Sequence, residues 1–307
     1  MQLAIASLKP SSQAEYKGAL NAFLKFCARK HIAIHDWNDV DYSLCKYMVY
    51  TYQKHGGLIG RQKCSKARSA LLFFCPELSQ KLLLSNKSLR GWEKLAPSQQ
   101  YVPFPFELAM GTAYQLFRRG KVAMAVGMIL QFDAYLRVGE LIALRKRQII
   151  FHAHPTNNEY GTLILPATKA GENQSVTFRG RFLHALLRRL TAQLQNDDRL
   201  FAFSEDTFRR QITITLKILK CYFFTVSSHG LRHGGSTYDA ERGIPFEQIK
   251  IRGRWRRDQT VFHYLQQGVV AEIRKKIPPV TRRRLNRLTS NLSYYFNIDD
   301  LTDGAEG

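Results

Sequence analysis

The chain has 307 residues, and 45% of them are hydrophobic, which is enough for two domains with separate cores and excludes general disorder. Its 46 Lys and Arg against 24 Asp and Glu give a formal net charge of +22, and a charge this large points to a polyanionic partner. Residues 1–100 contain 15 Lys and Arg and 6 Asp and Glu, a net +9, which leaves +13 for the remainder. We therefore expect both halves of the chain to contact that partner.

The first hundred residues predict a helical domain. A capping-box pattern of Ser12 and Glu15 precedes apolar residues at helical spacing. The apolar periodicity predicts four helices, near residues 12–27, 42–53, 61–74 and 78–89. The third helix carries a basic outer face formed by Arg61, Lys63, Lys66 and Arg68. We expect this face to contact the partner, and a merely solvated face is the alternative.

Three prolines, Pro97, Pro103 and Pro105, mark an extended linker after this domain. Beyond it the pattern predicts three short strands between residues 148 and 178 and helices at 106–118, 122–132, 182–193, 206–219 and from about 229. We therefore predict a mainly α fold with a small antiparallel β-sheet. Its parts are a helical domain at 1–95, a linker at 96–106, an α+β domain at 107–284 and a C-terminal tail at 285–307.

The cysteines and histidines do not predict a metal site or a disulfide framework. The five cysteines are an odd number, and no two form a Cys-x-x-Cys pair. The pair His31 and His35 and the pair His152 and His154 have spacings that suit a metal, but neither has a third ligand nearby. Uncharged stretches such as residues 122–132 are too short to span a bilayer, and no signal peptide opens the chain, so we expect a soluble intracellular protein.

Four residues in the last third of the chain have a spacing that suits attack on a phosphodiester. His229 and Arg232 stand three residues apart, Trp255 follows Arg232 by 23 residues, and Tyr264 follows Trp255 by nine. A tyrosine hydroxyl has a reference pKa of about 10, so it attacks phosphorus well only if a base removes its proton. Arginine forks hold phosphate oxygens bidentately and stay protonated at any working pH.

Two upstream segments extend the pattern. Arg137 is followed three residues later by Glu140 at the start of an apolar helix. Residues 161–166 are typical of a strand, and this strand runs into a turn that contains Lys169. With Arg, Lys, His-x-x-Arg, Trp and Tyr in this order, the chain resembles the tyrosine recombinase, or phage integrase, family.

The resemblance implies a catalytic role for these residues. Tyr264 would be the nucleophile, and Arg137 and Arg232 would hold the non-bridging oxygens of the phosphate. Lys169 would protonate the leaving 5′-oxygen. The interval between the first arginine and this lysine varies within the family, and Arg179 lies nearby as another cation.

The remaining site residues would support that chemistry. His229 would accept or relay the proton of the tyrosine, and the indole N–H of Trp255 would donate to a phosphate oxygen. Glu140 would orient a cationic or imidazole partner. Where the family usually has Gly before its His or Trp, this chain has Arg254, which either reshapes the turn or adds a phosphate contact.

The function implied by the resemblance is site-specific DNA recombination or integration through a 3′-phosphotyrosyl intermediate. No metal or cofactor is expected, and the expected partners are double-stranded DNA and three further copies of the chain, in a homotetramer on paired sites. A type IB topoisomerase is the alternative enzyme, but His229 and Trp255 stand where that class usually has Lys and His. A domesticated DNA-binding protein that has lost cleavage is the third possibility. The protein would act on DNA in the nucleus of a eukaryote or the nucleoid of a prokaryote.

The C-terminal tail carries an apolar stripe at helical spacing, formed by Leu285, Leu288, Leu292 and Tyr295. An isolated helix this short is marginal in water, so the stripe must be buried against something. Because the family commonly passes its last helix to the next subunit, the resemblance favours docking on a neighbouring protomer. Packing on its own catalytic domain is the alternative.

Overall fold

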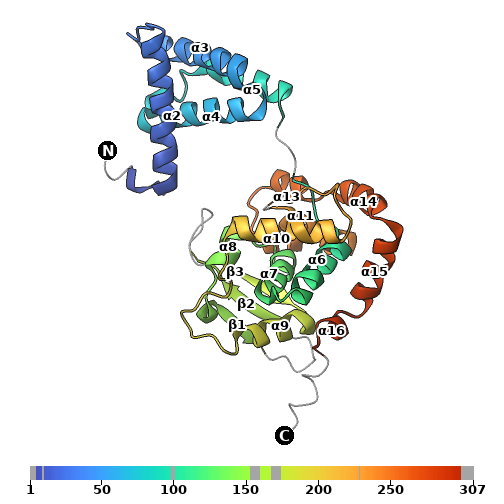
Figure 1. The fold of residues 1–307 in the computed structure, drawn as a ribbon. Coiled ribbons are helices and arrows are strands. Elements are labelled where there is room, and N and C mark those ends of the chain that lie inside the picture. Colours follow the sequence, from blue (N-terminus) through green and yellow to red (C-terminus); the bar gives the residue numbers. More distant parts are fainter. Residues whose placement is uncertain are drawn as a thin grey trace. The chain divides into compact units, whose positions relative to one another are not determined.

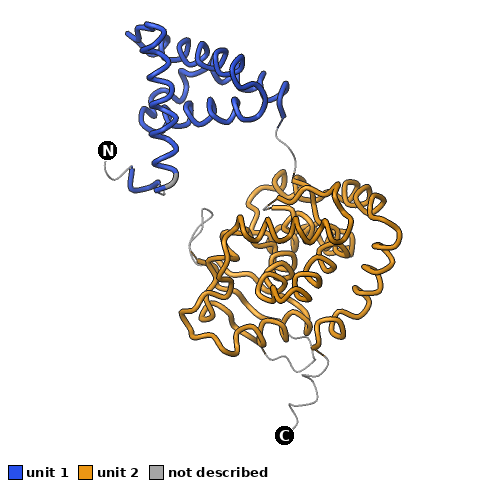
Figure 2. Tube along the Cα trace, in the orientation of Figure 1, with its two compact units in different colours: residues 1–100 blue, residues 101–307 orange. Residues whose placement is uncertain are grey.

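The structure is a computed structural model that describes residues 5–8, 10–97, 101–152, 160–166, 174–227 and 229–298. The chain forms two compact units, Met1–Gln100 and Tyr101–Gly307 (Figure 2). Each unit has its own hydrophobic core, centred on Leu44 and Cys64 in the first and on helix α7 in the second. In the described parts of the chain, no helix is long and apolar enough to cross a membrane.

Unit 1 is helical, as predicted. Its helices are α2 (Pro10–Arg29), α3 (Trp37–His55), α4 (Gly57–Phe74), the 3₁₀ turn η1 (Pro76–Leu78) and α5 (Leu83–Leu95) (Figure 1). Helix α4 packs against both α2 and α3, and α5 packs on α3. Helix α3 begins after Asp36, whose carboxylate accepts from the backbone N–H groups of Asn38 and Asp39 at 2.8 and 2.9 Å.

The predicted helix boundaries in unit 1 were wrong at several places. Helices α3 and α4 begin at Trp37 and Gly57, five and four residues before the predicted starts. The first helix begins at Pro10 rather than after Ser12, since proline suits a first helical turn. The predicted helix at 78–89 is split, and α5 begins only at Leu83. Its first turn is capped from α3, because the buried carboxylate of Asp41 accepts from the backbone N–H groups of Leu84 and Ser85 at 2.7 and 2.9 Å.

Unit 2 combines helices with one small sheet, as predicted. Its elements are α6 (Phe106–Arg118), α7 (Val122–Asp133), α8 (Val138–Ala143), η2 (Lys146–Gln148), β1 (Ile149–His152), β2 (Tyr160–Ile164), β3 (Ser175–Arg179), α9 (Arg181–Thr191), α10 (Glu205–Ile218), α11 (Gly230–Glu241), α12 (Phe246–Gly253), α13 (Asp258–Tyr264), α14 (Gln267–Lys276), α15 (Pro279–Ser290) and α16 (Leu292–Tyr295). The three strands pair antiparallel in the order β1-β2-β3, with Ile149 opposite Leu163 and Gly161 opposite Phe178.

Helix α7 lies at the centre of unit 2 and contacts α6, α9, α11 and β3. Its residues from Ala125 to Phe132 are all buried. Helix α11 approaches it closely because Gly235 has no side chain: a Cβ there would lie 1.9 Å from the backbone oxygen of Phe132. Helix α11 carries Arg232, and the chain that leaves α7 leads to Arg137.

The predicted linker at 96–106 extends too far into unit 2. Phe104 is fully buried, and its backbone N–H donates to the carbonyl of Gly230 at 3.1 Å. The ring of Tyr101 packs on that of His229 with centroids 4.9 Å apart. Residues 101–106 are therefore part of the second unit, because they close over the start of α11.

The C-terminal stripe packs on its own unit, with Leu292 and Tyr295 half-buried. Helix α15 packs on α6, and Leu285 and Leu288 are buried there. A Cβ on Gly111 of α6 would lie 2.0 Å from Cδ2 of Leu285, so the leucine occupies the space that the glycine leaves. The rings of Tyr114 and Phe296 lie 5.7 Å apart. The stripe therefore packs in cis, on its own unit. This is the alternative that the sequence analysis gave to docking on a neighbouring protomer.

Candidate active site

The first arginine of the pattern stands where α7 ends and α8 begins. Arg137 directly precedes α8, and its backbone N–H and guanidinium both donate to Glu140, at 2.9 and 2.6 Å. Glu140 is buried and also accepts from Arg254 at 2.7 Å. Burial alone would raise the pKa of Glu140, but Arg254 and Arg137 outweigh it and lower the pKa below its usual value. Glu140 is therefore an ionised link between two arginines.

Arg232 lies on α11 and is the largest fully buried side chain in the described structure. Its guanidinium donates to two backbone carbonyls, those of Tyr135 and, at 2.5 Å, Gly253. The same guanidinium lies 4.8 Å from the ring centre of Trp255 and 5.4 Å from that of Tyr264. Burial, together with the nearby charge of Arg137, lowers the pKa of Arg232 to about 10, so it stays protonated at neutral pH.

Tyr264 is the last residue of α13 and is half-buried among aromatic rings. Its ring stacks on His233 at 4.1 Å and packs against Trp255 at 4.5 Å. Its backbone carbonyl accepts from the hydroxyl of Thr237 on α11 at 2.9 Å, which ties the end of α13 to α11. Trp255 is buried, and no described residue accepts from its indole N–H. A polar ligand that reached this indole would find a free donor.

His229 directly precedes α11 and is partly buried beside Tyr101. No described residue bonds to its buried Nδ1. Burial lowers the pKa of His229, and the charges of Arg232 and Arg137 lower it further. The imidazole is therefore neutral at pH 7 and able to accept a proton.

The contacts above link Arg137 and Glu140 to Arg254, and they link Arg232 to Gly253, Trp255 and Tyr264. The two groups meet at the adjoining residues Gly253 and Arg254. Lys169 lies outside the described residues. Among the described residues, no group of three His, Cys, Asp or Glu side chains could hold a metal ion.

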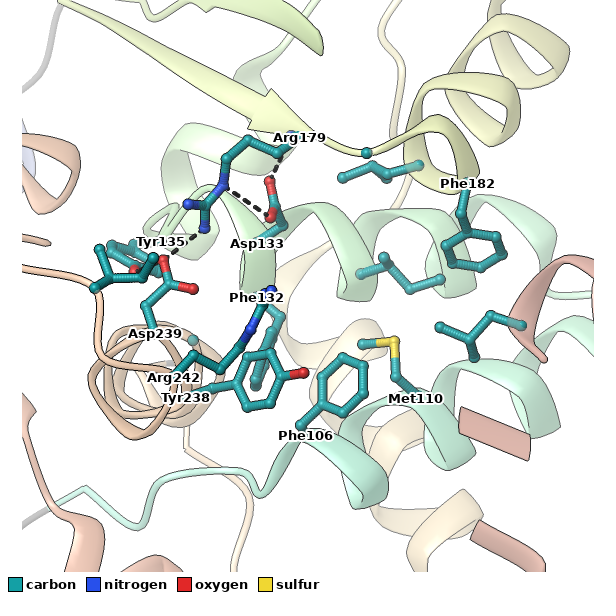
Figure 3. Close-up of a pocket in the computed structure, with 16 residues that line it drawn as sticks. Phe106, Met110, Phe132, Asp133, Tyr135, Arg179, Phe182, Tyr238, Asp239 and Arg242 are labelled. Atoms are coloured by element: carbon teal, nitrogen blue, oxygen red, sulfur yellow. Dashed lines mark hydrogen bonds and ion pairs between the residues drawn. The ribbon is translucent and has the colours of Figure 1, made fainter. Parts of the chain in front are cut away.

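Arg179, the other cation that lies near Lys169 in the sequence, bonds to two carboxylates. It donates to Asp239 at 2.5 Å, and its backbone N–H donates to Asp133 at 3.0 Å (Figure 3). Arg252 also donates to Asp133, at 2.7 Å, and Tyr135 donates its hydroxyl to Asp239 at 2.5 Å. The sequence did not reveal this network, because no spacing pattern connects positions that lie 46 to 119 residues apart.

The network borders a cavity of about 380 Å³. Figure 3 shows Arg179 between Asp133 and Asp239 at one side, with aromatic side chains at the other. Tyr238 lines this cavity and stacks on Phe106 with ring centres 4.3 Å apart. Tyr238 therefore packs among aromatic side chains rather than on the cluster around Arg232.

No protein-family model matches the sequence, and no curated protein matches it. Solved structures match the fold. The XerH site-specific recombinase bound to palindromic difH substrate, in a post-cleavage complex, aligns with a TM-score of 0.61 at 13% identity, over 82% of this chain and 75% of its own. The Tn1549 transposon integrase in complex with transposon right end DNA aligns with a TM-score of 0.56 at 10% identity, over 87% of this chain and 94% of its own.

The chain has the tyrosine recombinase fold. The resemblance in sequence rests on a few residues spread over more than 120 positions, and the fold agrees with it over most of the chain. In this fold, the residues of the sequence pattern that the structure describes fall at the starts of α8 and α11, just after the end of α12 and at the end of α13.

Arg254 does not lie where a DNA contact was expected. Its side chain is only 8% exposed and donates to Glu140. Its φ of 56° is in the left-handed region that favours glycine, which gives a physical reason for Gly at this place in the tyrosine recombinase pattern. The prediction of a direct phosphate contact from Arg254 is therefore not supported, because its guanidinium forms a buried ion pair with Glu140.

The predicted basic face of α4 is only partly exposed. The outward position predicted for Arg61 is wrong: the residue is 8% exposed and pairs with Glu93 of α5 at 3.0 Å. Arg68 is partly buried, whereas Lys63 and Lys66 are exposed. The two lysines border a groove of about 480 Å³ with further basic residues from α2 and α3, namely Lys25, Arg29, Lys54 and His55. The two exposed lysines of the predicted face therefore belong to a groove that α2, α3 and α4 line.

Proposed function

We propose that this chain is a site-specific DNA recombinase that cuts and rejoins DNA through Tyr264. The observation that carries the proposal is the contact of Tyr264 and Trp255 with the buried guanidinium of Arg232. A buried cation of this kind stabilises charge that develops on a phosphate far better than an exposed one does. The fold and the order of the sequence motifs support the same proposal.

In the proposed reaction, the hydroxyl oxygen of Tyr264 attacks the phosphorus and gives its proton to His229. Arg137 and Arg232 hold the non-bridging oxygens while the pentavalent phosphate forms. The bond to the 5′-oxygen breaks, and Lys169 supplies the proton that makes this oxygen a free hydroxyl. The product is a 3′-phosphotyrosine, and because the ester bond is kept, a second 5′-hydroxyl reverses the step without ATP.

The groove of unit 1 is proposed to bind the DNA backbone. Lys25, Arg29, Lys54, Lys63 and Lys66 place several cations on one surface, as a phosphate backbone requires. The XerH recombinase and the Tn1549 integrase were each solved with DNA, which supports a double-stranded DNA partner for this chain. We further propose that four copies act together on paired sites, as the family resemblance implies.

The test uses Tyr264→Phe with Tyr238→Phe as a matched control. Each change removes one phenol oxygen and keeps the ring. Wild-type chain and Tyr238→Phe should form covalent protein–DNA adducts on plasmids that carry the DNA flanking the gene, whereas Tyr264→Phe should bind DNA without forming any. Adducts that persist in Tyr264→Phe and vanish in Tyr238→Phe would move the nucleophile to Tyr238.

The same preparations separate the alternative functions. A recombinase should exchange strands between two site-bearing DNAs, whereas a topoisomerase should relax supercoiled plasmid without exchange. A chain that binds DNA but forms no adduct on any substrate would support the domesticated binding protein instead.

A further inference from the structure

The two carbonyls that hold Arg232 come from two unusual turns. One belongs to Tyr135, and the other belongs to Gly253, which directly precedes Arg254. Tyr135 and Arg254 have φ angles of 48° and 56°, in the left-handed region that side chains other than glycine rarely adopt. The fully buried guanidinium of Arg232 therefore lies between two turns that the backbone alone would not favour.

Each of these turns is fixed by a buried carboxylate. The hydroxyl of Tyr135 donates to Asp239 at 2.5 Å, and the guanidinium of Arg254 donates to Glu140 at 2.7 Å. A strained backbone conformation persists only where surrounding contacts hold it in place. For Tyr135, the contact that holds it comes from Asp239, seven residues or about two turns beyond Arg232 on α11.

Asp239 is held in turn by Arg179, at 2.5 Å (Figure 3). Burial alone would lower the pKa of Arg179, but Asp133 and Asp239 raise it above its usual value, so Arg179 stays protonated. The ring of Tyr135 also stacks near Trp255, with centroids 6.0 Å apart. One residue thus holds Arg232 through its backbone and supports Trp255 through its ring.

We propose that Tyr135 and Asp239 are positioning residues that set the orientation of the Arg232 guanidinium in the proposed strand-cleavage reaction. Of the five N–H groups of an arginine, two donate to the carbonyls here, and no described residue accepts from the Nε of Arg232. The carbonyl of Tyr135 decides which way the remaining donors point. Without the bond to Asp239, Tyr135 loses the contact that keeps its carbonyl in place, and the fork turns away from the phosphate.

The first test needs no DNA cleavage. In nitrogen-15 NMR of the DNA-free chain, two carbonyl bonds should slow rotation of the Arg232 guanidinium, so its terminal nitrogens should give separate signals. Tyr135→Phe removes only the hydroxyl, and Asp239→Asn removes the charge and replaces one acceptor oxygen by an NH2 donor. Both should merge or broaden these signals. Tyr114→Phe, which removes a phenol oxygen on α6, should leave them unchanged. Unchanged Arg232 signals in both site variants would overturn the inference.

The second test measures cleavage in a single turnover at saturating DNA, beside DNA affinity. Loss of the hydroxyl of Tyr135 should slow adduct formation roughly tenfold and leave the dissociation constant within about twofold. In an Arg232→Lys background, the same change should slow it further by less than about twofold, because no planar fork remains to be oriented. A repeated tenfold loss there would show a merely structural role and contradict the inference.

These results keep the two proposals apart. A wild-type chain that forms no adduct would refute the proposed function, while the NMR signals of Arg232 would still decide the positioning role. If the wild-type chain and Tyr135→Phe form adducts at the same rate, the proposed function stands and the positioning role is refuted.

Discussion

Leu285→Ala tests whether the C-terminal tail packs on its own unit in solution. Leu285 is 3% exposed, and its Cδ2 fills the space beside Gly111 of α6. Truncation of a buried leucine costs about 3 kcal/mol, from lost apolar burial and the cavity left behind. For a unit of this size, each 1 kcal/mol lowers the melting temperature by about 2–4 °C, so the loss should be roughly 6–12 °C. Scanning calorimetry at several protein concentrations measures it.

Val280→Ala on the same helix is the matched control, since Val280 is 54% exposed and its truncation should cost only about 0.5 kcal/mol. The partner change is Gly111→Ala, whose new methyl would clash with Leu285 in the wild type but would find vacant space in Leu285→Ala. The double variant should therefore be more stable than the two single effects predict. Equal melting temperatures for Leu285→Ala and Val280→Ala would refute the cis packing, and a wild-type melting temperature that rises with protein concentration would favour docking between protomers.

The structure also predicts an acid-sensitive core, a divided basic surface and a tight helix contact. Burial, with the nearby charges of His229, His263 and Arg232, lowers the pKa of His233 to about 3, below the unfolded value of about 6.5, so the unfolded chain takes up this proton first as pH falls. Stability should be complete above pH 6.5 and about 2 kcal/mol lower at pH 5 in urea titrations, and His233→Gln should lose less over the same interval. Lys66→Gln should reduce the slope of log affinity against log salt on duplex DNA by about 0.9, whereas Arg61→Gln should lower the melting temperature of unit 1 and leave that slope unchanged. Gly235→Ala should destabilise unit 2 by about 3 kcal/mol or more, because its methyl meets the backbone of Phe132, and a loss below about 1 kcal/mol in calorimetry would contradict the close contact of α7 and α11.

Periodicity predicted most elements because those elements bury one continuous face. The predicted helix at 106–118 has the observed bounds of α6, and the three strands match the predicted region except that β3 extends one residue beyond it, to Arg179. The start of α5 could not be predicted in this way, because Asp41, more than forty positions earlier, caps it. Arg61 was misplaced for a similar reason: its partner Glu93 lies on another helix, and one helix alone cannot show which face a neighbour covers.

The same limit applies to the candidate site: some of its residues could be predicted from the sequence and others could not. Arg137, Arg232 and Tyr264 could be proposed from order and spacing, because the chemistry needs those residue types. Tyr135 and Asp239 could not, since an ordinary aromatic residue and an ordinary helical carboxylate carry no spacing signal. Their importance depends on a left-handed turn and on a bond between residues 104 positions apart, which only the folded chain brings together.

The charges around the site include more positive than negative groups, which favours binding of a phosphate. Five arginines and three carboxylates meet here: Arg137, Arg179, Arg232, Arg252 and Arg254 with Asp133, Glu140 and Asp239. All of these arginines except Arg232 form an ion pair with one of the three carboxylates. The formal count of five positive and three negative charges is +2, and among the described residues Arg232 donates only to neutral carbonyls. A phosphodiester carries one negative charge and gains a second as the pentavalent state forms, so this surplus matches the proposed transition state better than the bound substrate.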